Sequence, residues 1–296
     1  MYFSKKSIVL FDGEWRKAED AEVSLYNQTM HYGLGVFEGM RAYKTDEGPK
    51  IFKPNRHFDR LINSAKKHHL NFPFSSTELT ELAYELLKKN KLQNAYIRPL
   101  IYAGPYMGLR TAPAAHFLMA AWEWNNYLGE EPLNVNISKY EKLNPAGAHI
   151  ESKVVGNYVN SILASNDARD KGYDEALMLD MNGFIAQGPA ANFFYEKDEV
   201  LYTPKKGYIM PGITRQTIID LANETGFKIV EKDIRPEEIL DADSAFFTGT
   251  AIEVTGIKSI EGREMQIPWK ESIGYSLFLM YRRKVTKDHL TAFNLV

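Results

Sequence analysis

The chain has 296 residues, of which 44% are hydrophobic and 25% are charged. This length and composition are typical of a globular protein with one large domain or two of moderate size. The 36 basic and 38 acidic residues leave a formal net charge of −2. Nothing in that balance favours binding to nucleic acid or to an anionic membrane.

Cysteine and histidine usage narrows the chemistry further. The chain has no cysteine, which excludes disulfides, thiolate metal sites and cysteine nucleophiles. The histidines show no metal-ligand spacing, so no metal is expected, and His31 and His57 are interpreted as structural. Residues 1–14 lack the apolar stretch of a signal peptide, and no window approaches the ~20 apolar residues of a membrane span. A cytoplasmic protein without a membrane partner is therefore expected.

In the N-terminal part, predicted strands flank two predicted helices. Asp12-Gly13 is typical of a tight turn between strands. From Asn55 onward, apolar residues recur at three- and four-residue spacing, which indicates a helix. Ser75 and Glu78 have the spacing of a capping box at the start of a second helix. The predicted strands are residues 7–11, 96–102 and 117–122.

The C-terminal part combines a predicted β meander with further helices. Asn182-Gly183 is a strong hairpin signal between two of the strands. Gly172 and Gly226 are typical helix stops, and Pro268 is well tolerated at a helix start. The predicted strands are residues 135–138, 176–179, 184–186, 192–195 and 200–202. The predicted helices are residues 157–171, 213–225 and 269–283.

The polar, aromatic and turn-rich stretch 124–131 is interpreted as a linker between an N-terminal domain, 1–123, and a C-terminal domain, 132–296. Because the strands come in hairpin runs rather than in strict alternation with helices, the expected fold class is α+β, not a Rossmann fold. Glycine-rich nucleotide-binding motifs are absent from the sequence.

Two segments have features of an anion-binding site. Segment 211–215 reads Pro-Gly-Ile-Thr-Arg and would present unpaired N–H groups at a helix start. Segment 248–251 reads Thr-Gly-Thr-Ala and ends an apolar strand in a tight turn, where consecutive N–H groups can form an anion-binding nest. Both would suit a phosphate, although an ordinary capped helix and an ordinary strand-ending turn explain the same patterns.

Lys153 is a candidate nucleophile. It follows a loop at 145–147 and precedes a predicted helix in an apolar stretch of the chain. Burial there would disfavour the charged form of an amine, and a neutral amine can attack an aldehyde. An ordinary surface lysine is the competing interpretation.

Several aromatic residues lie in loops and at element starts rather than at regular core spacing. Aromatic side chains with polar tips can build an apolar pocket with a few orienting hydrogen bonds. A place in the core explains each of them equally well. The set is Tyr32, Phe37, Trp124, Tyr127 and Tyr158.

Taken together and in this order, the segments resemble the class IV aminotransferases, the fold-type IV pyridoxal-phosphate enzymes. Within them, the chain is similar to bacterial branched-chain-amino-acid aminotransferases, over nearly its whole length. The resemblance implies a smaller N-terminal α/β domain, a larger β-rich C-terminal domain, and a homodimer or a higher homo-oligomer. Its strongest stretches are residues 31–33, 36–41, 96–100, Trp124 with 127–129, Lys153 with 156–158, and segments 211–215 and 248–251.

The resemblance also implies roles for individual residues. Lys153 would be the catalytic residue and would form a Schiff base with the cofactor, pyridoxal 5′-phosphate. The other cofactor-binding residues would be Arg60, Tyr158, Gln187, Ile213, Thr214 and Thr250, with Arg60, Ile213, Thr214 and Thr250 at the phosphate. The substrate-binding residues would be Tyr32, Phe37, Arg98, Trp124, Tyr127, Thr250 and Ala251.

The implied reaction moves the amino group of L-leucine, L-isoleucine or L-valine to 2-oxoglutarate. The Lys153 amine would carry the proton between the substrate α-carbon and C4′ of the cofactor. A D-amino-acid aminotransferase would usually have a histidine two residues after its arginine, whereas Arg98 is followed by Pro99 and Leu100. An aminodeoxychorismate lyase would lack the Tyr-x-Arg-Pro and Trp-x-x-Tyr combination. A binding protein with weakened catalysis stays open as an alternative from another class.

One position departs from the family pattern. Gln187 stands where the family usually has the glutamate that binds the pyridine nitrogen of the cofactor. A carboxylate keeps that nitrogen protonated, and a neutral amide does so less well. We expect the loss of a charged partner to raise the barrier by about 1–3 kcal/mol, or roughly tenfold to a hundredfold in rate. Ala191 replaces a second acidic residue, with no consequence that the sequence reveals.

Overall fold

The computed structural model describes residues 4, 6–124 and 131–286. The chain divides into two compact units. Unit 1 consists of Met1–Asn125 and Glu151–Val159, and unit 2 of Asn126–Ile150 and Asn160–Val296. The segment that carries Lys153 therefore groups with unit 1, although it follows the predicted linker at 124–131. Residues 125–130 of that linker lie outside the described residues, so the linker stays a prediction.

Unit 1 is built on a sheet with the strand order β2-β1-β7-β6-β4-β5, and β3 pairs with β6. Its strands are β1 (Ile8–Phe11), β2 (Glu14–Lys17), β3 (Gly35–Phe37), β4 (Met40–Thr45), β5 (Gly48–Ile51), β6 (Ala95–Ala103) and β7 (Ala115–Glu123). Its helices are η1 (Ala18–Asp20), α1 (Gln28–Tyr32), α2 (Pro54–Lys67), α3 (Ser76–Asn90) and η2 (Val155–Asn157).

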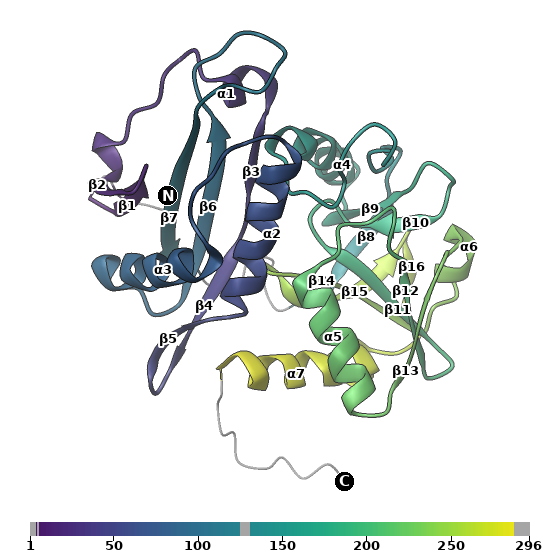
Figure 1. The fold of residues 1–296 in the computed structure, drawn as a ribbon. Coiled ribbons are helices and arrows are strands. Elements are labelled where there is room, and N and C mark those ends of the chain that lie inside the picture. The colour runs from purple at the N-terminus through teal and green to yellow at the C-terminus, as the bar shows by residue number, and fades with distance from the viewer. Residues whose placement is uncertain (1–3, 5, 125–130, 287–296) are drawn as a thin grey trace. The chain divides into compact units, whose positions relative to one another are not determined.

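Helices α2 and α3 pack on each other and on this sheet (Figure 1). Phe58 and Leu61 of α2 and Leu79 of α3 are fully buried in one apolar cluster with Met40 and Ile97 of the sheet. The predicted helices are confirmed, and so is the capping box: Ser75 Oγ accepts a hydrogen bond from the Glu78 N–H, and Glu78 accepts one from the Ser75 N–H.

Unit 2 contains a sheet with the order β10-β9-β8-β15-β14-β11-β12-β13, and β16 pairs with β15. Its strands are β8 (Leu133–Ile137), β9 (Glu175–Leu179), β10 (Ile185–Gln187), β11 (Asn192–Lys197), β12 (Val200–Pro204), β13 (Lys228–Lys232), β14 (Ser244–Gly249), β15 (Glu253–Ile260) and β16 (Arg263–Glu264). Its helices are α5 (Ile213–Glu224), α6 (Pro236–Ile239), η3 (Trp269–Glu271), α7 (Ile273–Thr286) and α4 (Tyr158–Asp170), whose first two residues belong to unit 1.

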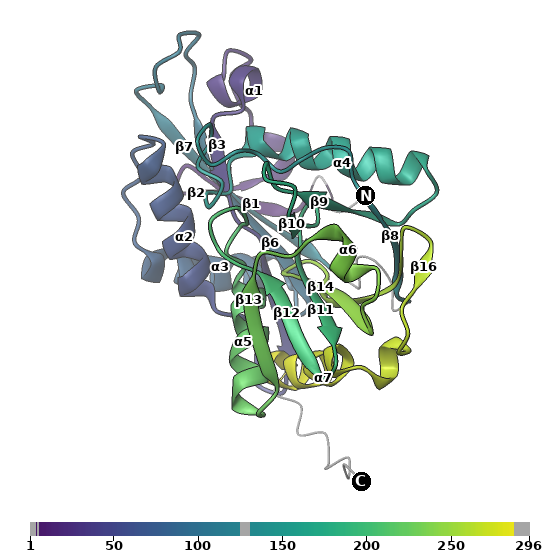
Figure 2. The ribbon, with the colours of Figure 1, turned by 90° about the vertical axis from the view of Figure 1, so that its right-hand side faces the viewer.

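A further pairing of β10 with β11 closes the strands from β10 to β11 into a ring. Apolar side chains such as Phe193, Phe247 and Ile257 form a buried cluster within this unit. Figure 2 shows α5 beside β12 and β13, and α5 and α7 contact each other and β14. The predicted α+β class and the predicted strands are confirmed. No helix among the described residues is long and apolar enough to cross a membrane.

The predicted helix over residues 269–283 is wrong at its start. A short 3-10 turn ends at Glu271, Ser272 is extended with φ −83° and ψ 159°, and α7 begins at Ile273. Ser272 Oγ donates to the Trp269 carbonyl over 2.7 Å and accepts from the Tyr275 N–H over 3.1 Å, so Ser272 caps α7. The Pro268 signal marked the 3-10 turn and not the helix.

Replacing Ser272 by alanine removes this cap. We expect Ser272→Ala to lower the free energy of unfolding by about 1 kcal/mol, because the first-turn donors of α7 lose an acceptor. Chemical denaturation measures the difference. Ser276→Ala within α7 is the matched control, and it should show no loss because alanine is the better helix former. Equal stability of the Ser272 variant and the wild type would contradict the capping role.

Candidate active site

The backbone of the Lys153 segment is held against β3. The Phe37 N–H donates to the Lys153 carbonyl over 3.0 Å. Val36 and Val154 form an isolated antiparallel bridge next to it. Lys153 therefore stands at a position defined by main-chain contacts, which locate a side chain better than a free loop does.

A close approach of two glycines continues this contact. The Gly156 N–H donates to the Gly33 carbonyl over 3.0 Å. Gly33 has a φ of +73°, and a Cβ added there would lie 2.8 Å from the α-carbon of Gly156. Both the left-handed backbone and the missing side chain are needed, which explains the glycine in the His-Tyr-Gly stretch.

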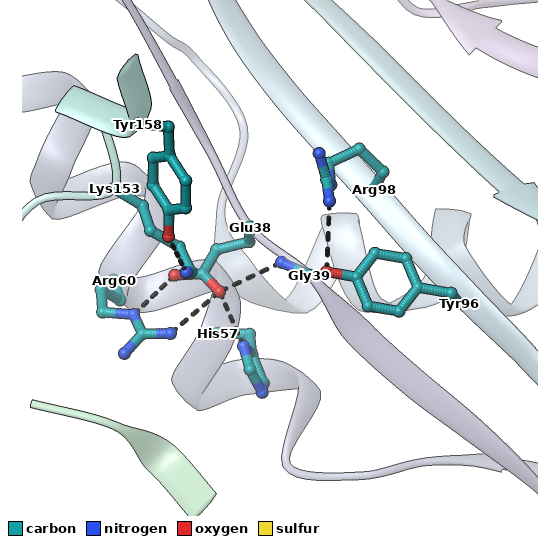
Figure 3. A network of polar contacts seen from close by, with 8 residues as sticks. All are labelled: Glu38, Gly39, His57, Arg60, Tyr96, Arg98, Lys153 and Tyr158. Atoms are coloured by element: carbon teal, nitrogen blue, oxygen red, sulfur yellow. Dashed lines mark hydrogen bonds and ion pairs between the residues drawn. The ribbon is translucent and has the colours of Figure 1, made fainter. Parts of the chain in front are cut away.

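The amine of Lys153 lies beside the Tyr158 side chain (Figure 3), and the Phe37 ring is close to it. Its Nζ donates to the Tyr158 hydroxyl over 2.5 Å and lies 5.3 Å from the Phe37 ring centre. The rings of Phe37 and Tyr158 pack edge to face, with their centres 4.8 Å apart. Lys153 and Tyr158 are half-buried, so Lys153 is not an ordinary surface lysine.

Arg60 belongs to a buried charge cluster next to this amine (Figure 3). Its Nε and a terminal nitrogen donate to the two carboxylate oxygens of Glu38 over 2.5 and 3.0 Å. His57 Nδ1 lies 2.8 Å from the same carboxylate, and the Gly39 N–H donates to it over 3.3 Å. Glu38 is fully buried, whereas the Arg60 side chain keeps 15% exposure. Glu38 therefore fixes the direction of the Arg60 guanidinium.

The protonation states in this cluster follow from burial and charge. Burial would raise the pKa of Glu38, but Arg60 and the hydrogen bond from His57 outweigh it, so the pKa lies well below its usual range. Burial lowers the pKa of His57, and the nearby cations Arg60 and Lys153 lower it further, against the effect of Glu38. A neutral His57 then donates from Nδ1 to an ionised Glu38.

Arg98 also lies beside the Phe37 ring. Its guanidinium carbon is 4.7 Å from the Phe37 ring centre and 5.3 Å from that of Tyr96, whose hydroxyl accepts a hydrogen bond over 3.3 Å. The buried Arg98 Nε has no hydrogen-bond partner within the part of the chain that the structure describes. A buried donor without a partner is expected to bind an anionic or carbonyl oxygen of a ligand.

The other predicted pocket residues of unit 1 differ in their surroundings. The Trp124 ring lies 5.0 Å from that of Tyr96 and so joins the aromatic group around Arg98. The Tyr32 hydroxyl donates to the Met107 carbonyl over 3.2 Å instead of pointing to the lysine. Tyr127 lies outside the described residues.

In unit 2, the predicted phosphate donors start a helix. Gly212 is the N-cap of α5 and has no side chain to cap it, so the first-turn N–H groups at Ile213 and Thr214 are available to an anion. Thr250 and Ala251 follow directly after the end of β14 and are half-buried.

Gln187 lies buried in unit 2 with its amide in use. Its Oε1 accepts a hydrogen bond from the Met210 N–H over 2.7 Å, and its Nε2 donates to the Gly188 carbonyl over 3.2 Å. Asn192 Nδ2 donates to the Met210 carbonyl over 2.9 Å. Ala191 packs in the apolar cluster of unit 2.

Sequence reasoning missed the role of Glu38 and assigned His57 only a structural one. A usable signal was present, because His57 and Arg60 are three residues apart and share one face of α2. Glu38 gave no local signal, because a buried carboxylate in an apolar strand region is recognised only by its partners.

The residues of each unit fit part of a phosphorylated aldehyde such as pyridoxal phosphate. Unit 1 offers an amine in contact with aromatic side chains and beside an oriented guanidinium. Unit 2 offers an uncapped helix start. An amine can bond to the aldehyde, and a guanidinium and helix N–H groups suit a phosphate dianion.

We expect Glu38→Gln to lower the free energy of unfolding by about 3–5 kcal/mol at neutral pH, because it removes the buried carboxylate charge that pairs with the Arg60 guanidinium. The pKa of Glu38 is lowered in the folded protein, so its contribution is present above the pKa of an unfolded glutamate, about 4.3, and is lost as the pH falls below that value. Denaturation of variant and wild type at several pH values measures both effects.

Glu81→Gln, at an exposed position of α3, is the matched control and should change stability by less than about 0.5 kcal/mol. A stability difference for Glu38→Gln that persists unchanged into strong acid would contradict the buried ion pair.

Comparison with known proteins identifies the family. The sequence matches the family model described as "Amino-transferase class IV" over residues 35–260. The branched-chain-amino-acid aminotransferase of Pseudomonas aeruginosa is 42% identical over 267 residues, which cover 88% of this chain and 87% of that protein. The branched-chain aminotransferase of Thermoproteus uzoniensis, solved with norvaline, aligns with a TM-score of 0.91 at 35% identity over 96% of each chain.

The branched-chain amino acid aminotransferase of Thermobaculum terrenum, solved in its PLP-form, aligns with a TM-score of 0.90. It is 28% identical, and the alignment covers 95% of this chain and 94% of that one. The family match extends over well more than half of the sequence, and the chain therefore belongs to the class IV aminotransferases.

Proposed function

We propose that this protein is a pyridoxal-phosphate-dependent aminotransferase that moves the amino group of branched-chain L-amino acids to 2-oxoglutarate. The observation that carries the proposal is the Lys153 amine, which meets the Tyr158 hydroxyl at 2.5 Å beside the Phe37 ring. The similarity to branched-chain aminotransferases over nearly the whole chain supports the substrate class.

When bound, pyridoxal phosphate supplies an electron sink that acidifies the α-carbon of an attached amino acid. Lys153 would hold the cofactor through its aldehyde carbon, and its amine, once displaced by the amine of the substrate, would carry the proton between the substrate α-carbon and C4′ of the cofactor. Tyr158 orients that amine through the hydrogen bond between them. In unit 1, Arg60, oriented by Glu38, would offer its guanidinium to the phosphate. In unit 2, the N–H groups at the start of α5 and at Thr250 would offer donors to a phosphate.

The substrate is bound by an apolar wall with a few polar groups. Phe37 and Trp124 offer aromatic surface for a branched aliphatic side chain, together with Tyr32 and Tyr127. The unpartnered Nε of Arg98 suits the second carboxylate of 2-oxoglutarate, which an apolar wall alone would reject. Thr250 and Ala251 offer N–H groups to the α-carboxylate.

We expect Lys153→Ala to abolish the near-visible absorbance band of the lysine-bound cofactor. Turnover of L-leucine with 2-oxoglutarate should fall by at least about 10²–10⁴-fold, the contribution of a positioned acid–base group. Lys66→Ala, at an exposed position of α2, is the matched control and should retain both band and activity. An unchanged absorbance band in the Lys153 variant would rule out the assignment.

A panel of amino acids separates the alternatives. A branched-chain aminotransferase changes its absorbance on mixing with L-leucine alone, whereas a D-amino-acid aminotransferase responds to D-amino acids. An aminodeoxychorismate lyase needs no 2-oxo acid acceptor. A static spectrum with every amino acid would indicate a cofactor-binding protein with weakened catalysis.

We also propose that the protein is a cytoplasmic homodimer. Support for the homodimer comes from an apolar patch on unit 1, which consists of the exposed side chains of Leu25, Tyr26, Met30, Met107 and Leu109; Leu109 is 92% exposed. A hydrogen bond from the Tyr106 N–H to the Tyr26 carbonyl ties its two segments together. Apolar surface of this kind usually meets a partner, and a second copy offers the same patch in return.

Replacing Leu109 by aspartate should shift the protein from dimer to monomer, because a carboxylate would be buried against apolar side chains of the second copy. Light scattering coupled to gel filtration measures the mass. Met181→Asp, at an exposed turn of unit 2, is the control that should leave the mass unchanged. A dimer that survives in Leu109→Asp would exclude this patch as the interface.

A further inference from the structure

A row of neutral polar side chains crosses three neighbouring strands of unit 2. Gln187 of β10 is directly opposite Asn192 of β11, and Asn192 is directly opposite Thr248 of β14. Residues directly opposite each other in antiparallel strands place their side chains on the same face of the sheet. The three side chains are buried. Thr248 Oγ1 has no hydrogen-bond partner among the residues that the structure describes.

A register shift accounts for the direction of Gln187. Ile185 pairs with Leu179, whereas Gln187 pairs with Met178, so the regular alternation is broken between them. Ile185 and Leu179 belong to the apolar cluster of the ring, and Met178 to a different cluster. Such irregularities re-aim a side chain, and here the shift aligns Gln187 with Asn192 and Thr248.

The row adjoins the proposed phosphate donors. Gln187 and Asn192 bind the N–H and the carbonyl of Met210, which lies two residues before the N-cap Gly212. A Cβ added at Gly212 would lie 2.1 Å from Asn192 Oδ1, so the start of α5 rests directly on the row. At the other end of the row, Thr250 follows Thr248 by two residues.

The main chain fixes the orientation of the Gln187 amide, whose NH2 group keeps a second N–H beyond its contact with Gly188. The amide oxygen is bound to the Met210 N–H over 2.7 Å, and the amide nitrogen faces the Gly188 carbonyl over 3.2 Å. A flipped amide would place its NH2 group against the Met210 N–H and its oxygen against the Gly188 carbonyl. Both contacts would pair like groups, so the observed orientation is the one that the backbone selects.

We propose that Gln187 binds the pyridine nitrogen of the cofactor as a hydrogen-bond donor, and that this nitrogen is therefore unprotonated in the resting holoenzyme. The inference rests on the proposed function. A buried N–H donor can pair only with an acceptor, and a pyridine nitrogen accepts only when it carries no proton. Asn192 and Thr248 add no charge to the row, and Ala191 beside it is apolar, so these neighbours give a ring proton no carboxylate to pair with.

The test measures the protonation of the nitrogen directly. The holoenzyme is prepared with pyridoxal phosphate carrying 15N in the ring, and its 15N chemical shift is recorded for the wild type and for Gln187→Glu. Protonation of a pyridine nitrogen moves this signal far upfield. We expect the unprotonated position in the wild type and the protonated position in Gln187→Glu, whose carboxylate can hold the ring proton. Gln266→Glu makes the same chemical change at an exposed position and should match the wild type.

Each outcome decides the question. A protonated nitrogen in the wild type would overturn the inference, even if Gln187→Glu failed to fold. An unprotonated nitrogen that stays so in a folded, cofactor-loaded Gln187→Glu would also overturn it, because another group would then be its partner. Failure of the wild type to retain the cofactor would instead count against the proposed function, and the inference would fall with it.

Discussion

The site in unit 1 depends on the main-chain contact between residues 151–159 and β3. The hydrogen bond from Phe37 to Lys153 and the bridge between Val36 and Val154 hold the segment in place, and the Gly33–Gly156 approach extends the contact. A lysine side chain has many rotamers, so its amine is positioned only if its α-carbon is fixed and its stem is enclosed. The same strand supplies Phe37, whose ring forms one wall around the amine, so the scaffold and the pocket share their residues.

In unit 1, the charged side chains of Glu38 and Arg60 hold each other in fixed directions. A buried carboxylate costs free energy unless it is paired, and Glu38 is paired with Arg60 and hydrogen-bonded by a neutral His57. These contacts hold the Arg60 guanidinium in one direction, close to the amine of Lys153. Preorganised donors of this kind bind a dianion without reorganising at the moment of binding.

The polar row around Gln187 in unit 2 consists of neutral side chains, whereas the cluster around Glu38 in unit 1 is charged. Gln187 and Asn192 hold both polar groups of the Met210 backbone, and this contact places the start of α5 next to the polar row. A glutamate at position 187 could also accept from the Met210 N–H, but its second oxygen would face the Gly188 carbonyl. The main chain around this position is thus compatible with an amide, and the amide presents a donor where a carboxylate would present an acceptor.

Local patterns in the sequence were sufficient for the longer helices and for many of the strands. The apolar spacing of α2, the capping box at Ser75 and the glycine stops depend on neighbours within one or two turns, and such interactions leave a readable period. The start of α7 was misjudged because Ser272, not the proline before the 3-10 turn, caps the helix.

Contacts between distant residues left no such pattern. Glu38 and Arg60, Gly33 and Gly156, and Gln187 and Met210 meet across 22, 123 and 23 positions of the chain. The folded backbone brings these partners together, because hydrogen bonds and steric fit act at a few ångströms regardless of separation along the chain. The sequence therefore showed that a glutamine stands at position 187. The direction of its amide depends on the fold around Met210 and could not be predicted from the sequence.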